Sequence, residues 1–351
     1  MFLLGYAIPS TILPGLLWGG GWTFFSLVFV FGVTPIADLS AGRDSENRTP
    51  SSSWPYDLLV WGLAPVQIGL ITWTLANVTS PGTSTFERVG LVLSLGVVTG
   101  ASGITVAHEL MHRSRRFEQA LAEVLMTSVS YPHFCIEHVF GHHRHVATPA
   151  DPATARLGES VYRFLPRTLL GGLRSFTRIE AERVRVHGRR GLSDARVRYG
   201  LLLGTAYGLV FACFGAGGVV AFLIQGAVAV VLLEVINYVE HYGLLRRKLS
   251  GPGEPPRYER VQARHSWNSN HRLTNAYLFH LPRHADHHFL ASRPYHLLRH
   301  RADGPQLPAG YATMVILALV PPWWFRVMNP RVEALRSDGG VPAERELSAR
   351  P

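Results

Sequence analysis

The sequence has few cysteines and a low share of charged residues. Its 351 residues include two cysteines, Cys135 and Cys213, which are too few for a disulfide framework, a zinc ribbon or a four-thiolate iron–sulfur centre. Charged residues make up 17% of the chain, below the roughly 25% usual for soluble domains. This composition excludes a disordered chain, a collagen-like repeat and a coiled coil. Any thiolate-based electron-transfer centre must belong to another protein.

Lysine is almost absent, because Lys248 is the only one, and the net charge of +10 comes from arginine. Nucleic-acid-binding modules interleave basic and aromatic residues on one soluble face, whereas these arginines lie between apolar segments. That distribution is typical of the positive-inside pattern of membrane proteins. We therefore expect a lipid bilayer around the chain and no nucleic-acid partner.

No charged side chain occurs from Phe2 to Ile36. One helix needs about 20 residues to cross about 30 Å of hydrocarbon, so this stretch fits two short spans that turn at residues 19–21, which are all glycine. The stretch lacks the basic start of a signal peptide and continues into more apolar sequence. It is therefore expected to belong to a membrane domain.

Further apolar stretches predict an all-α fold, a bundle of six transmembrane helices with a cytoplasmic helical cap. The spans are expected near residues 2–17, 20–36, 57–78, 89–112, 199–214 and 219–241. The last two spans are expected to turn at glycines between Gly215 and Gly218. Tyr311 to Phe325 fits a buried or interfacial segment better than a span because it contains paired prolines and tryptophans.

Arginine predicts the orientation of these spans. The two glycine links, at residues 19–21 and 215–218, carry no arginine, and the link at residues 81–88 carries only Arg88. Residues 113–198 and 242–330, in contrast, are rich in arginine. These two segments are therefore expected to be cytoplasmic, together with both termini, in a plasma or inner membrane. Residues 1–330 are expected to form a single domain, followed by a polar tail, residues 331–351.

Histidine is absent from the first 107 residues, and the 17 histidines that follow are clustered. Pairs four residues apart lie on one helix face and suit one metal ion, whereas adjacent pairs can address two ions. The clusters are HELMH at 108–112, EHVFGHH at 137–143, NYVEHYG at 237–243 and RHADHH at 283–288. An intramembrane zinc protease would leave most of these histidines unexplained, and a metal transporter would place its ligands at mid-membrane.

These clusters, with the runs IEHVFGHHRHVATPADPATARLGESVYRF and HSWNSNH, resemble the integral-membrane alkane monooxygenases. The wider superfamily includes xylene monooxygenases, fatty-acid desaturases and carotenoid hydroxylases. The resemblance implies a diiron site with two non-haem iron ions and dioxygen as co-substrate. Its ligands by position would be His108, His112, His138, His142, His143, His241, His284, His287 and His288.

The resemblance also implies acidic neighbours that accept N–H hydrogen bonds from the ligand rings. The candidates are Glu109, Glu137, Asp151, Glu240 and Asp286. Among the other histidines, His187, His296 and His300 are expected to be surface or hydrogen-bonded residues. Non-ligand roles are also favoured for His145 and His280, whereas those of His133, His265 and His271 stay open.

The implied reaction is hydroxylation of the terminal methyl of a medium-chain alkane or similar alkyl group, with a xylene-type or fatty-acyl hydroxylase or desaturase as the alternative. Candidates for the walls of the substrate channel are Trp22, Phe25, Val235 and Ile236, although lipid-facing or core packing explains each equally well. Electrons would come from a rubredoxin or ferredoxin with its NAD(P)H reductase, docked on arginines between 174 and 198 or between 246 and 264. Attraction to anionic lipid explains at least half of those arginines equally well.

Overall fold

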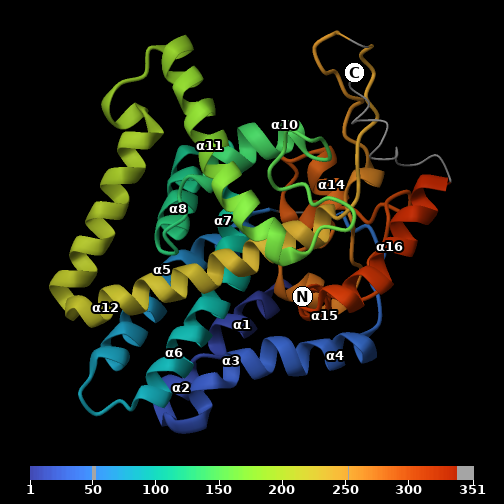
Figure 1. Cartoon of the computed structure of the whole chain (residues 1–351). Helices are drawn as coiled ribbons and strands as arrows, with labels where there is room; N and C mark the ends of the chain where they lie inside the picture. Colours follow the sequence, from blue (N-terminus) through green and yellow to red (C-terminus); the bar gives the residue numbers. More distant parts are fainter. Residues whose placement is uncertain (50–52, 252, 338–351) are drawn as a thin grey trace.

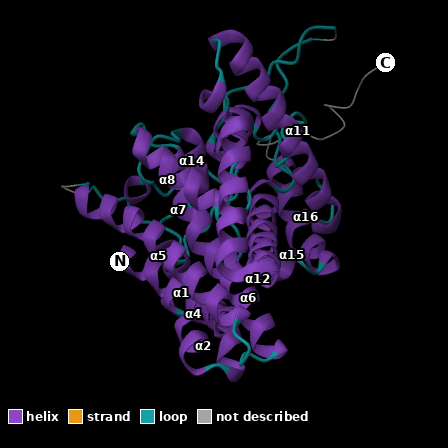
Figure 2. Ribbon diagram, turned by 90° about the vertical axis from the view of Figure 1, so that its left-hand side faces the viewer, coloured by secondary structure: helices purple, strands orange, loops and turns teal. Residues whose placement is uncertain are grey.

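The computed structural model describes residues 1–49, 53–251 and 253–337 (Figure 1). These residues form helices joined by loops and contain no strand, as Figure 2 shows. The predicted all-α class is therefore confirmed for the part of the chain that the structure describes.

Four helical stretches are long and apolar enough to cross a membrane: Gly20–Ala41, Trp54–Thr79, Thr85–Met111 and Ala195–His241. The second is the single helix α5 (Trp54–Thr79), with a proline in its first turn. The third consists of α6 (Thr85–Val98), the π-helical turn η4 (Thr99–Ile104) and α7 (Thr105–Met111). A capping box fixes its start, because Ser84 and Glu87 satisfy each other's backbone N–H groups.

The first 41 residues form a chain of short helical pieces. They are η1 (Phe2–Tyr6), α1 (Ala7–Ser10), α2 (Leu13–Trp18), η2 (Gly20–Phe24), α3 (Phe25–Val28), η3 (Phe29–Val33) and α4 (Thr34–Ala41). The chain turns where it was predicted to turn, since Gly19 and Gly20 adopt φ values of 65° and 54° that other residues rarely adopt. Only the part after this turn is long enough for a span, because Phe2–Trp18 is a shorter apolar stretch.

The longest element, α12 (Ala195–His241), consists of two helices that meet at Gly215. This glycine has φ 64° and ψ −166°, a conformation that suits a residue without a Cβ. The two arms of α12 are visible at the left of Figure 1. The turn predicted near residues 215–218 is therefore present, and the two expected spans are the two arms of one hairpin.

The count of six spans stays a prediction. Only four stretches in the described chain meet the criteria of length and composition, or five if α15 (Tyr311–Ala318) and α16 (Pro321–Ser337) count as one span. These two helices are bent by 118° relative to each other, which agrees with a segment that does not cross the membrane as one straight helix. The expected tail is helical as far as Ser337, with Val332 buried, and its residues 338–351 lie outside the described part.

The remaining elements come from the two segments expected to be cytoplasmic. They are α8 (Arg116–Thr127), α9 (Phe134–Glu137), η5 (His138–His142), α10 (His143–His145), α11 (Val161–His187), η6 (Gly191–Ser193), η7 (Ala263–His265), α13 (Arg272–Tyr277), α14 (His284–Phe289) and η8 (Tyr295–Leu297). Figure 1 shows α8, α10, α11 and α14 together at the end of the bundle opposite α2. The ends of α7 and α12 thus meet the helices of these two segments at one end of the molecule.

Buried polar contacts hold this end together. The buried Arg283, which precedes α14, donates from its Nη1 to the carbonyl of Leu298 at 2.8 Å and from its Nη2 to those of Asp44 and Glu46 at 3.2 and 3.1 Å. The side chain of Asn268 accepts a hydrogen bond from the N–H of Ala285 at 2.8 Å. These contacts fix α14 against segments distant in the sequence, because an unpaired polar group would be costly at such depth.

Candidate metal centre

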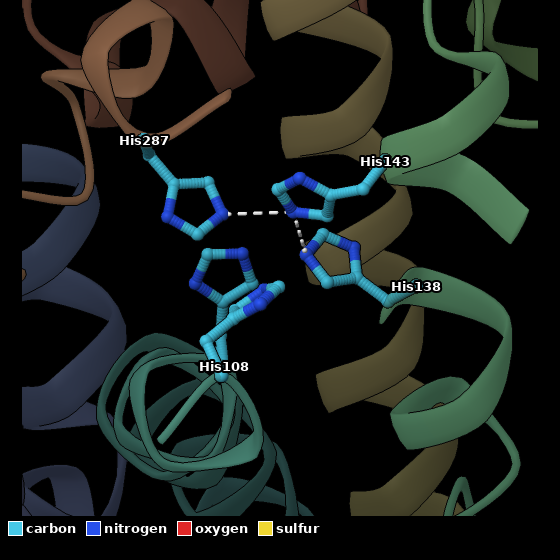
Figure 3. A group of neighbouring side chains, drawn as sticks. His108, His138, His143 and His287 are labelled. Atoms are coloured by element: carbon cyan, nitrogen blue, oxygen red, sulfur yellow. Dashed lines mark hydrogen bonds between the residues drawn. The ribbon is translucent and has the colours of Figure 1, made fainter. Parts of the chain in front are cut away.

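Nine histidines form two neighbouring groups where α7 and α12 end and where η5, α10 and α14 lie. The first group contains His108, His112, His138, His143 and His287, and the second contains His142, His241, His284 and His288. Within each group one ring nitrogen of every member lies within 4.8 Å of the others. Figure 3 shows His108, His138, His143 and His287 pointing toward one another from different elements. The structure thus brings together the nine histidines that the family resemblance implied.

Each of two adjacent histidine pairs is divided between the two groups. His142 belongs to the second group and His143 to the first, while His287 belongs to the first and His288 to the second. Neighbours on a helix point about 100° apart, so one short helix can supply a ring to each of two positions. The expectation that adjacent histidines address two ions agrees with this arrangement.

The pair His138 and His142, four residues apart, does not share a group. These residues lie in the π-helical turn η5, where the wider turn brings residues five apart onto one side. The Nε2 atoms of His138 and His143 are accordingly 3.0 Å apart, although the residues are five positions apart in sequence. Sequence spacing assumed an ordinary α-helix and therefore assigned the wrong partner to His138.

The donor atoms fit a bound cation. The Nε2 atoms of His143 and His287 are 3.0 Å apart, those of His241 and His284 are 3.2 Å apart, and those of His284 and His288 are 2.9 Å apart. Two imidazole nitrogens at right angles on one ion, each about 2.1 Å from it, would be about 3 Å apart. The buried Nε2 of His112 has no hydrogen-bond partner in the described structure, and coordination of a metal ion would satisfy this nitrogen.

The protonation of the rings also suits metal binding, which requires neutral imidazole. Burial, reinforced by the neighbouring histidines, holds the pKa of His138, His143, His287 and His288 well below its usual range. At His142 burial also lowers the pKa, but the carboxylate of Asp151 outweighs it and raises the value. Most of the rings are therefore neutral donors before any ion binds.

Two of the five acidic candidates contact a ring. An oxygen of Asp151 lies 2.9 Å from Nδ1 of His142, the nitrogen that faces away from the group, so this carboxylate fixes the ring's orientation. Glu240 behaves differently, because its Oε2 lies 3.2 Å from Nε2 of His284, the nitrogen that faces into the group. Glu240 therefore lies on the side of the ring that faces the group. The role expected for it, accepting an N–H hydrogen bond from the outer nitrogen, would have placed it on the opposite side of the ring.

The other three acidic candidates do not hydrogen-bond to a ligand ring in the described structure. Glu109 pairs with Arg113 at 2.6 Å, and Asp286 pairs with Arg293 and accepts from the N–H of Arg299 at 2.9 Å. One carboxylate oxygen of Glu137 is buried without a hydrogen-bond partner. Glu109 and Asp286 have arginines in reach after folding, and an arginine is the stronger partner for a carboxylate.

The other histidines lie outside both groups. His265 contacts Glu259 at 3.2 Å, His271 contacts Ser269 at 2.9 Å, and His280 has Nδ1 3.2 Å from the carbonyl of Tyr295. His133 packs against Tyr131. The remaining four are His145, His187, His296 and His300, and none of them joins a group. The expectation of surface or hydrogen-bonded positions needs one correction, since His296 is buried and stacks on Tyr56.

An apolar cavity reaches both groups. Its walls come mainly from η3, η4, α12, α13 and α15, and its lining includes His108 of the first group and His284 of the second. The apolar lining residues include Ile8, Val30, Phe31, Ala101, Ile104, Leu232, Leu233, Ile236, Leu278 and Val315. Of the four residues predicted for a channel, Ile236 lines this cavity, whereas Trp22, Phe25 and Val235 do not. Trp22 is half exposed beyond the turn at Gly19, and Val235 is buried on another face of α12.

Sequence patterns gave no sign of Tyr311. This buried tyrosine lines the cavity and donates a hydrogen bond of 2.6 Å from its hydroxyl to Glu240 Oε1. It lies 71 positions after Glu240, at the start of the apolar stretch expected to be buried or interfacial. Hydrophobicity alone predicted burial there, and only the packing of α15 against α12 reveals the polar contact.

Comparison with known proteins identifies the family. The fatty acid desaturase family model matches residues 86–318. Alkane 1-monooxygenase 1 of Pseudomonas aeruginosa is 46% identical over 94% of this chain and 88% of its own length. Alkane 1-monooxygenase 2 of Alcanivorax borkumensis is 39% identical over 89% of this chain and 83% of its own. The hydroxylase component of xylene/toluene monooxygenase of Pseudomonas putida is 28% identical over 98% and 92%.

The identities, the coverage and the apolar helices agree with one another. The matches to the alkane enzymes span most of both chains, and the helices give the chain the character of a multi-pass integral membrane protein. A chain this similar to monooxygenases is itself an oxidoreductase of that kind. The protein belongs to the alkane 1-monooxygenase family, within the membrane desaturase and hydroxylase superfamily.

Proposed function

We propose that the protein hydroxylates the terminal methyl of medium-chain alkanes or similar alkyl groups. The observation that carries this proposal is the apolar cavity whose lining includes His108 and His284, one residue from each histidine group. The names of two relatives, the alkane 1-monooxygenases of Pseudomonas aeruginosa and Alcanivorax borkumensis, support the same substrate class.

The cavity binds by exclusion of water. Its apolar wall around Val30, Leu232 and Val315 offers no ionic anchor, so a charged group lying along that wall should bind poorly. Each methylene transferred from water contributes roughly 0.8 kcal/mol, so affinity should rise with chain length until the cavity is filled. The polar lining near Glu240 and Tyr311 lies beside His284, where a methyl group at the end of the chain would meet the metal centre.

The nine histidines would hold two iron ions, five rings on one and four on the other. Imidazole suits iron, and iron with open coordination positions supplies the activation of dioxygen against a C–H bond. The protein's own contribution is to hold the rings neutral and oriented, with Asp151 fixing His142. Burial of the rings keeps bulk water from the reacting carbon.

The balanced reaction converts a methyl group, dioxygen, two electrons and two protons to a primary alcohol and water. The electrons would come from a partner, because the chain's two cysteines are too few for a four-thiolate electron-transfer centre. We propose a rubredoxin or ferredoxin with its NAD(P)H reductase. The exposed basic residues Arg144, Arg247, Lys248 and Arg260 lie close in sequence to ligand histidines or to the loop after α12, which favours an acidic protein docking there.

We also propose that the metal centre and both termini face the cytoplasm. The histidine groups lie at the end of α7 and α12 that is followed by the arginine-rich segments, and cytoplasmic loops carry such an excess. A reductase chain that draws on NAD(P)H would be available only on that side.

The test is reconstitution with a rubredoxin, its reductase and NADH, combined with elemental analysis of the purified protein. We expect two iron ions per chain and primary alcohols from linear alkanes, measured by gas chromatography. Stoichiometric zinc without iron-dependent turnover would overturn the proposal. Oxidation of alkylbenzenes alone would replace it with a xylene-type function, and double bonds formed in fatty acyl chains would replace it with a desaturase function.

A further inference from the structure

A second apolar groove lies at the other end of the membrane domain, far from the histidines. It runs between the end of α5, the start of α6 and the hinge of α12. In Figure 1 the loop after α5 and this hinge both lie at the lower left. The apolar or small lining residues are Val78, Thr79, Val89, Val92, Leu93, Phe214, Gly217, Val220, Ala221 and Ile224.

One charged residue, Arg88, lines this groove. Its Nη2 donates a hydrogen bond of 3.0 Å to the carbonyl of Ser80, while its Nε is buried without a hydrogen-bond partner in the described structure. The neighbouring Glu87 does not neutralise it, because that carboxylate accepts instead from the N–H groups of Ser84 at 3.0 Å and Gly20 at 2.7 Å. Arg88 thus brings to the apolar groove a positive charge that forms no ion pair with a carboxylate of the described chain.

The position of Arg88 along the membrane normal follows from helix geometry. Arg88 and His108 lie in the same continuous span, 20 residues apart in sequence. At 1.5 Å per residue this separation is about 30 Å, the thickness of the hydrocarbon core. Arg88 is therefore at headgroup level on the face of the membrane opposite the metal centre. The exposed aromatic residues Trp18, Trp22 and Phe86 lie near this same end, as aromatic residues do at membrane interfaces.

We propose that this groove is a binding site for one anionic phospholipid of the leaflet opposite the metal centre. The phosphate would pair with the guanidinium of Arg88, whose fork of N–H donors matches phosphate oxygens. An acyl chain would lie along Val92, Phe214 and Ile224 and fill the space between the α12 hinge and α6. The groove lining has an arginine and no carboxylate, so it can pair with a phosphate but not with a choline ammonium, and this selects an anionic phospholipid over a zwitterionic one. The apolar lining selects a lipid over a free anion.

The bound lipid would support the hinge of α12. Gly215 carries the left-handed φ, and Gly217 leaves space beside Thr79, because a Cβ added at this glycine would lie 3.8 Å from the Thr79 methyl group. The second arm of α12 leads from this hinge through the cavity wall to His241. A lipid wedged at the hinge therefore lies at the start of the helix that carries part of the metal centre.

The experiment is native mass spectrometry of the full chain released from vesicles of phosphatidylglycerol or phosphatidylcholine. We expect retained phosphatidylglycerol to exceed phosphatidylcholine about tenfold, which equals about 1.4 kcal/mol and is close to the contribution of one hydrogen bond to a charged group. Arg88→Gln should remove that preference. The matched control, Arg163→Gln, makes the same charge change at an exposed arginine of α11 that lies outside the arginine-rich ranges 174–198 and 246–264, and it should leave the preference unchanged. Gly217→Leu should reduce retention of both lipids, because its side chain enters the groove.

Several results would overturn the proposal. Equal retention of phosphatidylglycerol by Arg88→Gln and Arg163→Gln would show that Arg88 does not select the lipid. Displacement of the lipid by millimolar inorganic phosphate alone would identify an anion site without an acyl chain. A dimer peak without lipid that Gly217→Leu abolishes would assign the groove to a second copy of the chain. Circular dichroism of each variant separates these outcomes from misfolding.

Discussion

The two histidine groups differ in the carboxylates that contact their rings. In the described structure no carboxylate oxygen contacts a ring nitrogen of the first group, whose five members are held by packing and by one another. The second group has four rings, and carboxylates contact two of them, Asp151 at His142 and Glu240 at His284. A carboxylate beside a divalent cation offsets its charge and orients the ring, so the two metal positions are not equivalent.

The two groups also differ in the number of rings and in their link to the cavity. The five-ring group has more donors and would leave fewer open coordination positions on a bound ion, whereas the four-ring group has the carboxylates and is linked through Glu240 to Tyr311 in the cavity. Both groups reach the cavity, at His108 and His284. The comparison predicts that each position can be lost or weakened independently of the other.

The largest effect is expected for His241→Ala. The second group would keep three rings, so its ion should be lost while that of the first group remains, and turnover should be abolished. Elemental analysis should find one iron ion per chain, and gas chromatography should find no alcohol. His187→Ala, at an exposed histidine outside both groups, is the control. Full iron content in His241→Ala would remove this residue from the ligand set.

The adjacent pair in α14 should separate the two positions directly. His287→Ala removes a donor from the first group and His288→Ala removes one from the second, although the two residues are neighbours. Mössbauer spectra of iron-57 samples should therefore lose a different component in each variant. Loss of the same component in both would show that the two groups do not correspond to two ions.

A smaller effect is expected for Asp151→Asn. The amide can still accept a hydrogen bond from His142 but no longer offsets charge, and loss of such an orienting partner typically costs about 10–100-fold in metal affinity. Titration with a chelator should show faster loss of one of the two iron ions. Asp303→Asn, at an exposed carboxylate paired with Arg301, is the control. Equal iron retention in both variants would contradict the proposed role of charge in the second group.

The smallest effect is expected in the cavity wall. Ile236→Ala enlarges the cavity without touching a histidine, so the preferred alkane should become longer. Each additional methylene buried contributes roughly 0.8 kcal/mol, about fourfold in affinity. Product profiles across an alkane series measure the shift, with Val231→Ala on the exposed side of α12 as the control. An unchanged profile would mean that the substrate does not lie against Ile236, and iron content should be the same throughout.

The fold was largely predictable from the sequence because its signals are local. Apolar length set the positions of α5, the α6–α7 span and α12, and the glycines marked the turns at Gly19 and Gly215. Residues 2–18 were less predictable, since this apolar helical stretch is shorter than the four candidate spans. The end of α16 was set by packing, because Val332 is buried against the core although its neighbours are polar.

The nine clustered histidines were also identifiable from the sequence, as an implication of family motifs and not of spacing alone. Spacing correctly grouped His108 with His112 and His284 with His288, because each pair lies on one α-helical face. It failed for His138, since no sequence pattern announced the π-helical turn that pairs it with His143. It also failed for the acidic neighbours, because the arginines that capture Glu109 and Asp286 approach only in the folded chain.

The sequence by itself determined which residue types are available and which helices carry them: apolar spans, glycine hinges and four histidine clusters. Periodicity and composition act within one helix, so they can be read along the chain. Only the tertiary structure decided which histidines lie in the same group, that Glu240 lies beside the ring nitrogen of His284 that faces its group, and that Ile236 but not Trp22 lines the cavity. Those decisions depend on how helices far apart in the sequence pack against one another, and close packing is a property of the whole fold.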